Sequence, residues 1–69
     1  MNKYEIIIYW NETDGVFVAE IPELKGCIAH GDTQNEALKE VDKVAKEWLS
    51  LAKENSWLIP EPKGKLMYA

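Results

Sequence analysis

The sequence predicts an α+β fold in which a three-stranded antiparallel meander is followed by one long amphipathic helix and a short final strand. Two observations lead to this β-β-β-α-β prediction. Runs of β-branched and aromatic residues typical of strands lie before Asp32, and apolar residues recur with a helical period after it. Turn signals at Asp14-Gly15 and between Pro22 and Gly26 divide the part before Asp32 into three segments.

The first two strands form the predicted hairpin. Residues 3–11, KYEIIIYWN, are rich in β-branched and aromatic side chains, which favour strands. Asp14-Gly15 is a strong hairpin-turn signal, and residues 16–21, VFVAEI, form the returning strand. That strand ends at Pro22, because proline has no amide hydrogen to donate to the ladder.

The third strand and the helix follow a second turn. Gly26 can adopt the positive φ that a tight turn needs, and residues 27–31, CIAHG, form a short strand. Thr33 and Glu36 match a capping box at the start of a helix within residues 32–55. The apolar stripe of that helix consists of Ala37, Leu38, Val41, Val44, Ala45, Trp48, Leu49 and Ala52.

The chain after the helix is expected to be extended before it forms the last strand. Asn55 can close the helix, and Pro60 and Pro62 favour an extended backbone in the residues before them. Residues 64–69, GKLMYA, are the predicted final strand.

Both faces of the predicted hairpin carry large apolar side chains. One helix covers only one face of a sheet, so the second face is expected to pack against something else. A second copy of the chain is the simplest candidate, and we expect a homo-oligomer, either a dimer or a tetramer. In the first strand, Tyr4, Ile6, Ile8 and Trp10 share one face, and Glu5, Ile7 and Tyr9 share the other.

The length of 69 residues allows a single domain, residues 1–69, with a marginal core. The one cysteine, Cys27, cannot form an internal disulfide, and Cys27 and His30 are too isolated to suggest a metal site. No targeting segment is recognisable, and no apolar run approaches the ~20 residues of a membrane helix. We therefore expect a cytoplasmic protein without a cofactor, a metal ion or a membrane anchor.

The acidic charge is concentrated in the first half of the chain. Residues 1–32 contain two lysines and six acidic residues, a charge of 2 − 6 = −4, which equals the net charge of the whole chain. The chain contains no arginine, and surfaces that bind phosphates need clustered lysine and arginine. We therefore expect no direct binding to nucleic acid and favour a basic protein as the partner.

The residues with catalytic potential are better explained by structural roles. His30 stands near a strand end, without a second catalytic residue at a recognisable spacing. Cys27 lacks a Cys/His signature and is expected to be a small buried core residue. Trp10, Trp48 and Trp57 can stack on bases, but without a basic groove we expect them in the core or at an interface.

A metal-dependent nuclease is the enzymatic alternative. A meander followed by a helix opens the ribonuclease H-like fold, and four carboxylates could gather there to bind two metal ions. Acidic residues on strands are more often solvated or protect a sheet edge from pairing, so we expect no enzymatic activity. The four carboxylates are those of Glu5, Glu20, Asp32 and Asp42.

The ordered motifs along residues 4–62 resemble the HicB antitoxin family. No single motif is decisive, but their combination and order are specific. The family pattern has Asp-Gly, an aromatic-Val-Ala segment, a Pro-x-Leu-x-Gly-Cys turn, Gly-Asp-Thr and a helix with Glu-Ala. The matching residues are Asp14-Gly15, Phe17-Val18-Ala19, Pro22 to Cys27, Gly31-Asp32-Thr33, Glu36-Ala37 and the end segment Ile59 to Pro62.

The resemblance implies a HicB-like domain with a partial ribonuclease H fold that lacks the catalytic set. It implies an antitoxin that binds a HicA-like toxin, a small basic RNA-cleaving protein, and covers its RNA-binding and catalytic surface. Many family members also carry a C-terminal DNA-binding module. The chain stops at Ala69, so we expect a short form that does not bind an operator by itself.

The toxin needs a positive surface to bind RNA phosphates, and carboxylates on the antitoxin can compete for that surface. We therefore expect contributions from the acidic residues of the first half, from apolar anchors on the hairpin and from the bulky residue after the helix. The candidate partner-binding residues are Glu5, Ile7, Tyr9, Phe17, Glu20, Glu23, Asp32 and Trp57. The alternative, an orphan HicB-like module for another protein or a small ligand, stays open beside the enzyme.

Overall fold

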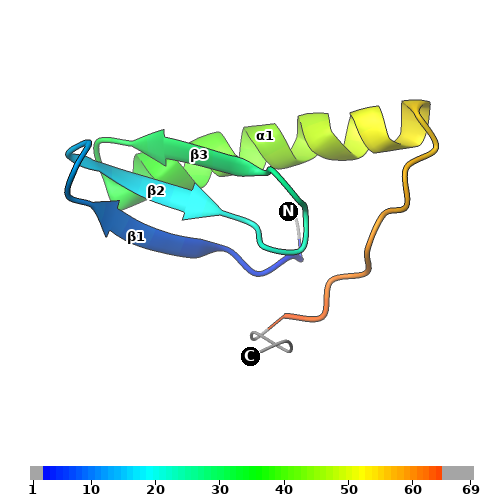
Figure 1. The fold of residues 1–69 in the computed structure, drawn as a ribbon, viewed down its shortest axis with the longest axis horizontal. Helices are drawn as coiled ribbons and strands as arrows, with labels where there is room; N and C mark the ends of the chain where they lie inside the picture. The colour runs from blue at the N-terminus through cyan, green and yellow to red at the C-terminus, as the bar shows by residue number, and fades with distance from the viewer. Residues whose placement is uncertain (1–2, 65–69) are drawn as a thin grey trace.

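A computed structural model describes residues 3–64, which form a three-stranded sheet with one helix packed on it (Figure 1). The strands are β1, Ile7–Asn11, β2, Val16–Glu20, and β3, Ile28–Gly31, and the helix is α1, Gln34–Glu54. The sheet has the order β1-β2-β3 with antiparallel neighbours. The predicted meander and helix are confirmed, although each strand is shorter than its apolar segment.

The β1–β2 hairpin is closed by the predicted Asp14-Gly15 turn. Gly15 has a φ of 65°, and its N–H donates to the carbonyl of Asn11 at 2.8 Å. The side-chain oxygen of Asn11 accepts the backbone N–H of Asp14 at 3.1 Å. Asparagine and aspartate at such positions replace part of the backbone hydrogen bonding that the turn loses. The turn is therefore held by both side-chain and backbone contacts.

Both ends of α1 are capped by the residues that the sequence indicates. The hydroxyl of Thr33 accepts the N–H of Glu36 at 3.0 Å, which satisfies one of the free donors of the first turn. Asn55 is the C-cap, and Ser56 follows with a positive φ of 57°. The N–H of Trp57 then donates to the carbonyl of Ala52 at 2.8 Å, as in a Schellman motif.

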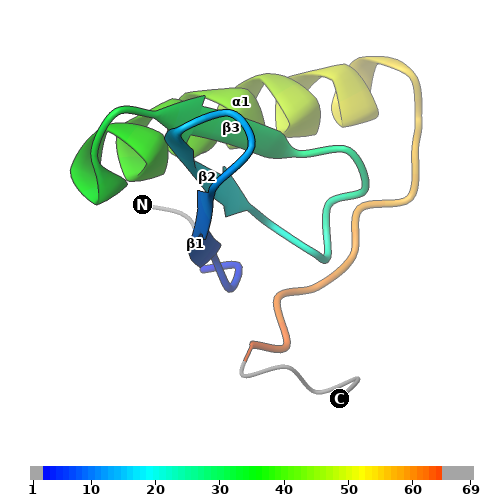
Figure 2. The ribbon, with the colours of Figure 1, turned by 60° about the vertical axis from the view of Figure 1, so that its left-hand side comes forward.

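The core lies between α1 and one face of the sheet, which Figure 2 shows from the side. Ala19 of β2 and Ala29 of β3 stand opposite each other on that face, and they leave room for a close helix. The helix contributes small and branched residues that are fully buried. The buried cluster consists of Ala19, Ile21, Leu24, Cys27, Ala37, Val41 and Ala45.

After the helix, the chain turns back toward Tyr4 and the β2–β3 turn (Figure 1). Residues 57–64, the described part of this segment, form no strand. The hydroxyl of Tyr4 donates to the carbonyl of Pro60, and burial, with help from the carboxylates of Glu23 and Glu61, raises the pKa of this phenol. The predicted final strand, 64–69, lies outside the described residues apart from Gly64. Among the described residues, no helix is both long enough and apolar enough to cross a membrane.

Candidate protein-binding surface

The strand register assigns every strand side chain to one of two faces. Residues directly opposite each other in an antiparallel pair share a face, and Ala19, which packs on the helix, pairs with Ile8 and Ala29. The alternate residues therefore point away from the helix. We call this surface the open face; it consists of Ile7, Tyr9, Asn11, Val16, Val18, Glu20, Ile28 and His30.

The open face is apolar at its centre. Val18 on the middle strand is only 7% exposed, because the side chains of Tyr9 and His30 stand opposite it on the two neighbouring strands. Tyr9 is 42% exposed and Ile28 is 49% exposed. Exposed apolar groups gathered on one face are typical of a binding surface rather than of a fully solvated one.

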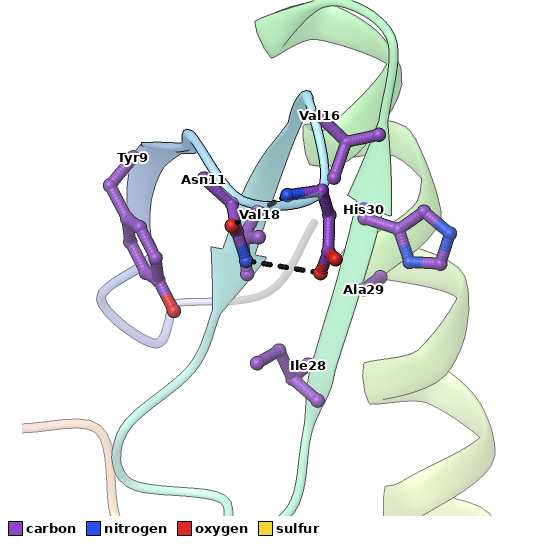
Figure 3. Close-up of a pocket in the computed structure, with 8 residues that line it drawn as sticks. Tyr9, Asn11, Val16, Val18, Ile28, Ala29 and His30 are labelled. Atoms are coloured by element: carbon purple, nitrogen blue, oxygen red, sulfur yellow. Dashed lines mark hydrogen bonds between the residues drawn. The ribbon is translucent and has the colours of Figure 1, made fainter.

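A shallow hollow of about 370 Å³ lies on this face. In Figure 3, Tyr9 and His30 lie on opposite sides of it, with Val18 and Ile28 between them. The hollow combines an apolar floor with a few polar groups at its rim, which is how protein sites commonly select their ligands. Its lining residues are Tyr9, Asn11, Asp14, Val16, Val18, Ile28, Ala29 and His30.

Asp14 is the one acidic residue that lines the hollow, and no lysine lines it, among the described residues. Its carboxylate oxygen Oδ2 accepts a hydrogen bond from the amide of Asn11 at 3.3 Å, and its backbone N–H donates to the same side chain at 3.1 Å. Glu20 adds a second carboxylate on the open face, opposite Ile7 and Ile28. The strands contribute no lysine, so the open face has a negative character.

The structure brings three of the predicted partner-binding residues together. Ile7, Tyr9 and Glu20 share the open face, as the alternation of strand side chains indicates. Glu5 lies just before β1, between Tyr4 and Ile6, which both pack against the core.

Phe17, Trp57 and Asp32 lie away from the open face. Phe17 is on the helix-covered side, where its ring meets Trp10 edge to face with centroids 5.0 Å apart. Trp57 packs against Trp48 at the far end of α1, with ring centroids 5.9 Å apart. Asp32 follows β3 at the hairpin end of the sheet, because Gly31 pairs with Phe17 near the start of β2.

Glu23 has a role inside the chain. Its oxygen Oε2 accepts the backbone N–H of Lys63 at 2.9 Å, so this carboxylate holds the segment after the helix against the β2–β3 turn. Sequence reasoning could not find this contact, because the two residues are 40 positions apart. The predicted set of eight residues is therefore divided among the open face, the core side, the tail and the two ends of the sheet.

The candidate catalytic residues have other environments. Cys27 is 2% exposed within the core, as predicted, and burial raises the pKa of its thiol, which disfavours the reactive thiolate. Glu20 and Asp32 lie at opposite ends of the sheet, and Asp42 contacts Lys46 at 3.6 Å on the helix. Within residues 3–64, no three His, Cys, Asp or Glu side chains come together to hold a metal ion.

Six open-face or rim residues were absent from the sequence-based set: Asn11, Asp14, Val16, Val18, Ile28 and His30. The alternation pattern could have found Val16 and Val18, since a simple hairpin register pairs them with Asn11 and Tyr9 on the outward face. Asp14 was assigned to turn formation alone. Its position over the hollow depends on its two hydrogen bonds with the Asn11 side chain and on where β3 lies.

These features define a small α+β domain with one covered sheet face and one apolar, acidic face available for binding. The chain belongs to the UPF0150-like family, which matches residues 3–60. A UPF0150 protein of Synechocystis sp. is 40% identical over 64 residues, covering 93% of this chain and 86% of that protein. A UPF0150 protein of Thermoplasma acidophilum is 34% identical over 58 residues, covering 84% and 83% respectively. No solved structure matches the chain with significance.

Proposed function

We propose that this protein is the antitoxin of a toxin–antitoxin pair. In this proposal it binds a small, basic, RNA-cleaving protein of the HicA type and covers the surface that binds and cleaves RNA. The ordered motifs that resemble HicB antitoxins support the proposal. The observation that carries it is the open face, which joins an apolar centre to carboxylates and contains no lysine.

The physical basis is competition for a positive surface. A protein that cleaves RNA must hold lysine or arginine side chains against the phosphates. A rigid sheet that presents Asp14 and Glu20 beside apolar side chains can take those cations and exclude water around them. The proposal places this action in the cytoplasm, on a partial ribonuclease H-like fold without catalytic activity of its own.

Glu20→Lys is expected to slow association with the toxin about tenfold at low salt, because charges at an interface steer encounter. Glu20 is half-buried on the open face, whereas Glu47 is exposed on α1. Glu47→Lys therefore changes the net charge equally and serves as the matched control. The association rate is measured by stopped flow at two salt concentrations, and neutralisation by the RNA cleavage that remains. Glu23 is left unchanged, since its carboxylate holds the tail.

One result would contradict the open-face mechanism, and another would contradict the absence of catalysis. Equal, salt-insensitive association of both variants would mean that the toxin contacts the helix or residues 57–64 instead. RNA incubated with the chain alone and magnesium or manganese is expected to stay intact. Cleavage that disappears in Asp32→Ala or Glu20→Ala would support the nuclease alternative.

Self-association remains part of the proposal, since a chain this small gains stability from a partner. The open face cannot hold the toxin and a second copy at once. The outer edge of β1, which pairs with no other strand within residues 3–64, offers another contact, because an edge strand presents unpaired backbone groups. At low micromolar concentration the chain is expected to sediment as a dimer, and Ile28→Lys on the open face is expected to leave that dimer intact. A wild-type monomer would contradict self-association. Loss of the dimer in Ile28→Lys would mean that the two copies contact each other through the open face.

A further inference from the structure

We propose that the hollow on the open face is the binding seat for an arginine side chain of a basic protein partner. The proposal rests on the proposed function, because that function supplies a basic partner, and it adds which side chain is recognised and where. Three features of the hollow support it: an apolar floor, one oriented carboxylate and two flanking rings.

The floor suits the aliphatic part of an arginine. Val16, Val18 and Ile28 line the hollow, and Ile28 keeps about half of its surface exposed at 49%. Arginine and lysine lay their methylene groups along apolar surface while the charged head reaches a polar group. Covering Ile28 with such a stem removes apolar area from water, which a compact polar side chain would not do.

The head group meets the carboxylate of Asp14. This side chain is oriented before any partner arrives, because Asn11 contacts both its Oδ2 atom and its backbone N–H. Gly15 fixes the same turn through its 2.8 Å hydrogen bond to the Asn11 carbonyl. Within residues 3–64, the Oδ1 atom of Asp14 accepts no hydrogen bond, so the carboxylate can still accept a charged donor. Preorganised groups lose less conformational freedom on binding.

Arginine fits the seat better than lysine does. Tyr9 and His30 flank the floor on opposite sides, and a planar guanidinium stacks on aromatic rings while it donates a fork of hydrogen bonds to a carboxylate. The chain contains no arginine, so a second copy cannot supply this side chain. No lysine between residues 3 and 64 lines the hollow, and neither ion pair of these residues involves Asp14. The partner is therefore a different, arginine-bearing protein.

The test is an NMR titration of the ¹⁵N-labelled chain with Nα-acetyl-arginine methylamide. Saturable shifts are expected at the backbone amides of Tyr9, Val18, Ile28 and His30. Asp14→Asn is expected to weaken this binding about fivefold or more, because a charge-assisted hydrogen bond becomes a neutral one. The matched control is Asp32→Asn, which removes a carboxylate at the same end of the sheet but outside the hollow and should leave binding unchanged. The uncharged isostere Nα-acetyl-citrulline methylamide should bind as weakly as Asp14→Asn binds arginine.

Several results would overturn the inference. Shifts that map to the helix, equal affinity of Asp14→Asn and wild type, or equal binding of the citrulline probe would each exclude the seat. Hollow amides that shift with protein concentration in the absence of probe would show that a second copy occupies it. An assay of toxin neutralisation distinguishes failure of this inference from failure of the proposed function. A toxin neutralised equally well by Asp14→Asn and wild type leaves the function standing and removes the seat. If the wild type binds the arginine probe but does not neutralise the toxin, the arginine seat stands and the proposed function is wrong.

Discussion

Gly31→Ala is expected to destabilise the domain by about 3 kcal/mol, the upper range for overpacking a tight contact. A Cβ atom at Gly31 would lie 2.6 Å from the backbone nitrogen of Ala37 and 2.7 Å from Cβ of Glu36. Both atoms belong to the first turn of α1, which cannot move without separating the helix from β3. A small domain has only about 3–5 kcal/mol of stability, so most of it would be lost. Urea denaturation followed by circular dichroism measures the change.

Gly15→Asn is the control for the loss of a glycine at the same end of the sheet. Gly15 has a φ of 65°, but a Cβ atom there would meet nothing within 4 Å. Asparagine tolerates this backbone conformation better than most residues, so the expected loss stays below about 1 kcal/mol. A Gly31→Ala protein as stable as wild type would mean that the helix does not approach β3 this closely.

Leu24→Ala is expected to cost about 2–5 kcal/mol, as for other leucines deleted from a packed core. Leu24 is 0% exposed, although it lies in a turn of the chain. Its N–H donates to the carbonyl of Ile21 at 3.0 Å, and its carbonyl accepts the N–H of Cys27 at 2.9 Å. These bonds direct the side chain under the helix, so its removal leaves a cavity where the turn meets the core. Thermal unfolding of the variant gives the measurement.

Leu58→Ala is the matched control, because Leu58 is 91% exposed. The same atoms are deleted, but the Leu58 side chain buries little apolar surface. The free energy of unfolding is therefore expected to change by less than about 0.5 kcal/mol. Similar losses in both variants would show that the tail, rather than the turn, contributes to the core.

Local signals were sufficient to predict the turns and the helix ends within residues 3–64. The hairpin, the second turn and both ends of α1 were predicted from Asp14-Gly15, Gly26, Thr33 and Asn55, and each has the expected role. Such features depend on backbone conformation and on hydrogen bonds between residues a few positions apart. The strand lengths were overestimated, because apolar composition continues past the last residue that has a ladder partner.

The order of residues along the chain is enough to predict a sheet with two apolar faces and an acidic first half. Which face the helix covers, and which acidic residues lie on the other face, depends on the packing of the folded chain. Small residues on one side, Ala19, Ala29 and Gly31, let the helix approach there, which leaves Val18 and its neighbours on the open face. Glu23 is tied to the tail and Asp14 stands over the hollow because residues distant in sequence meet there. Those contacts arise when the chain packs, so the alternation of apolar residues and the charge counts along the chain do not predict them.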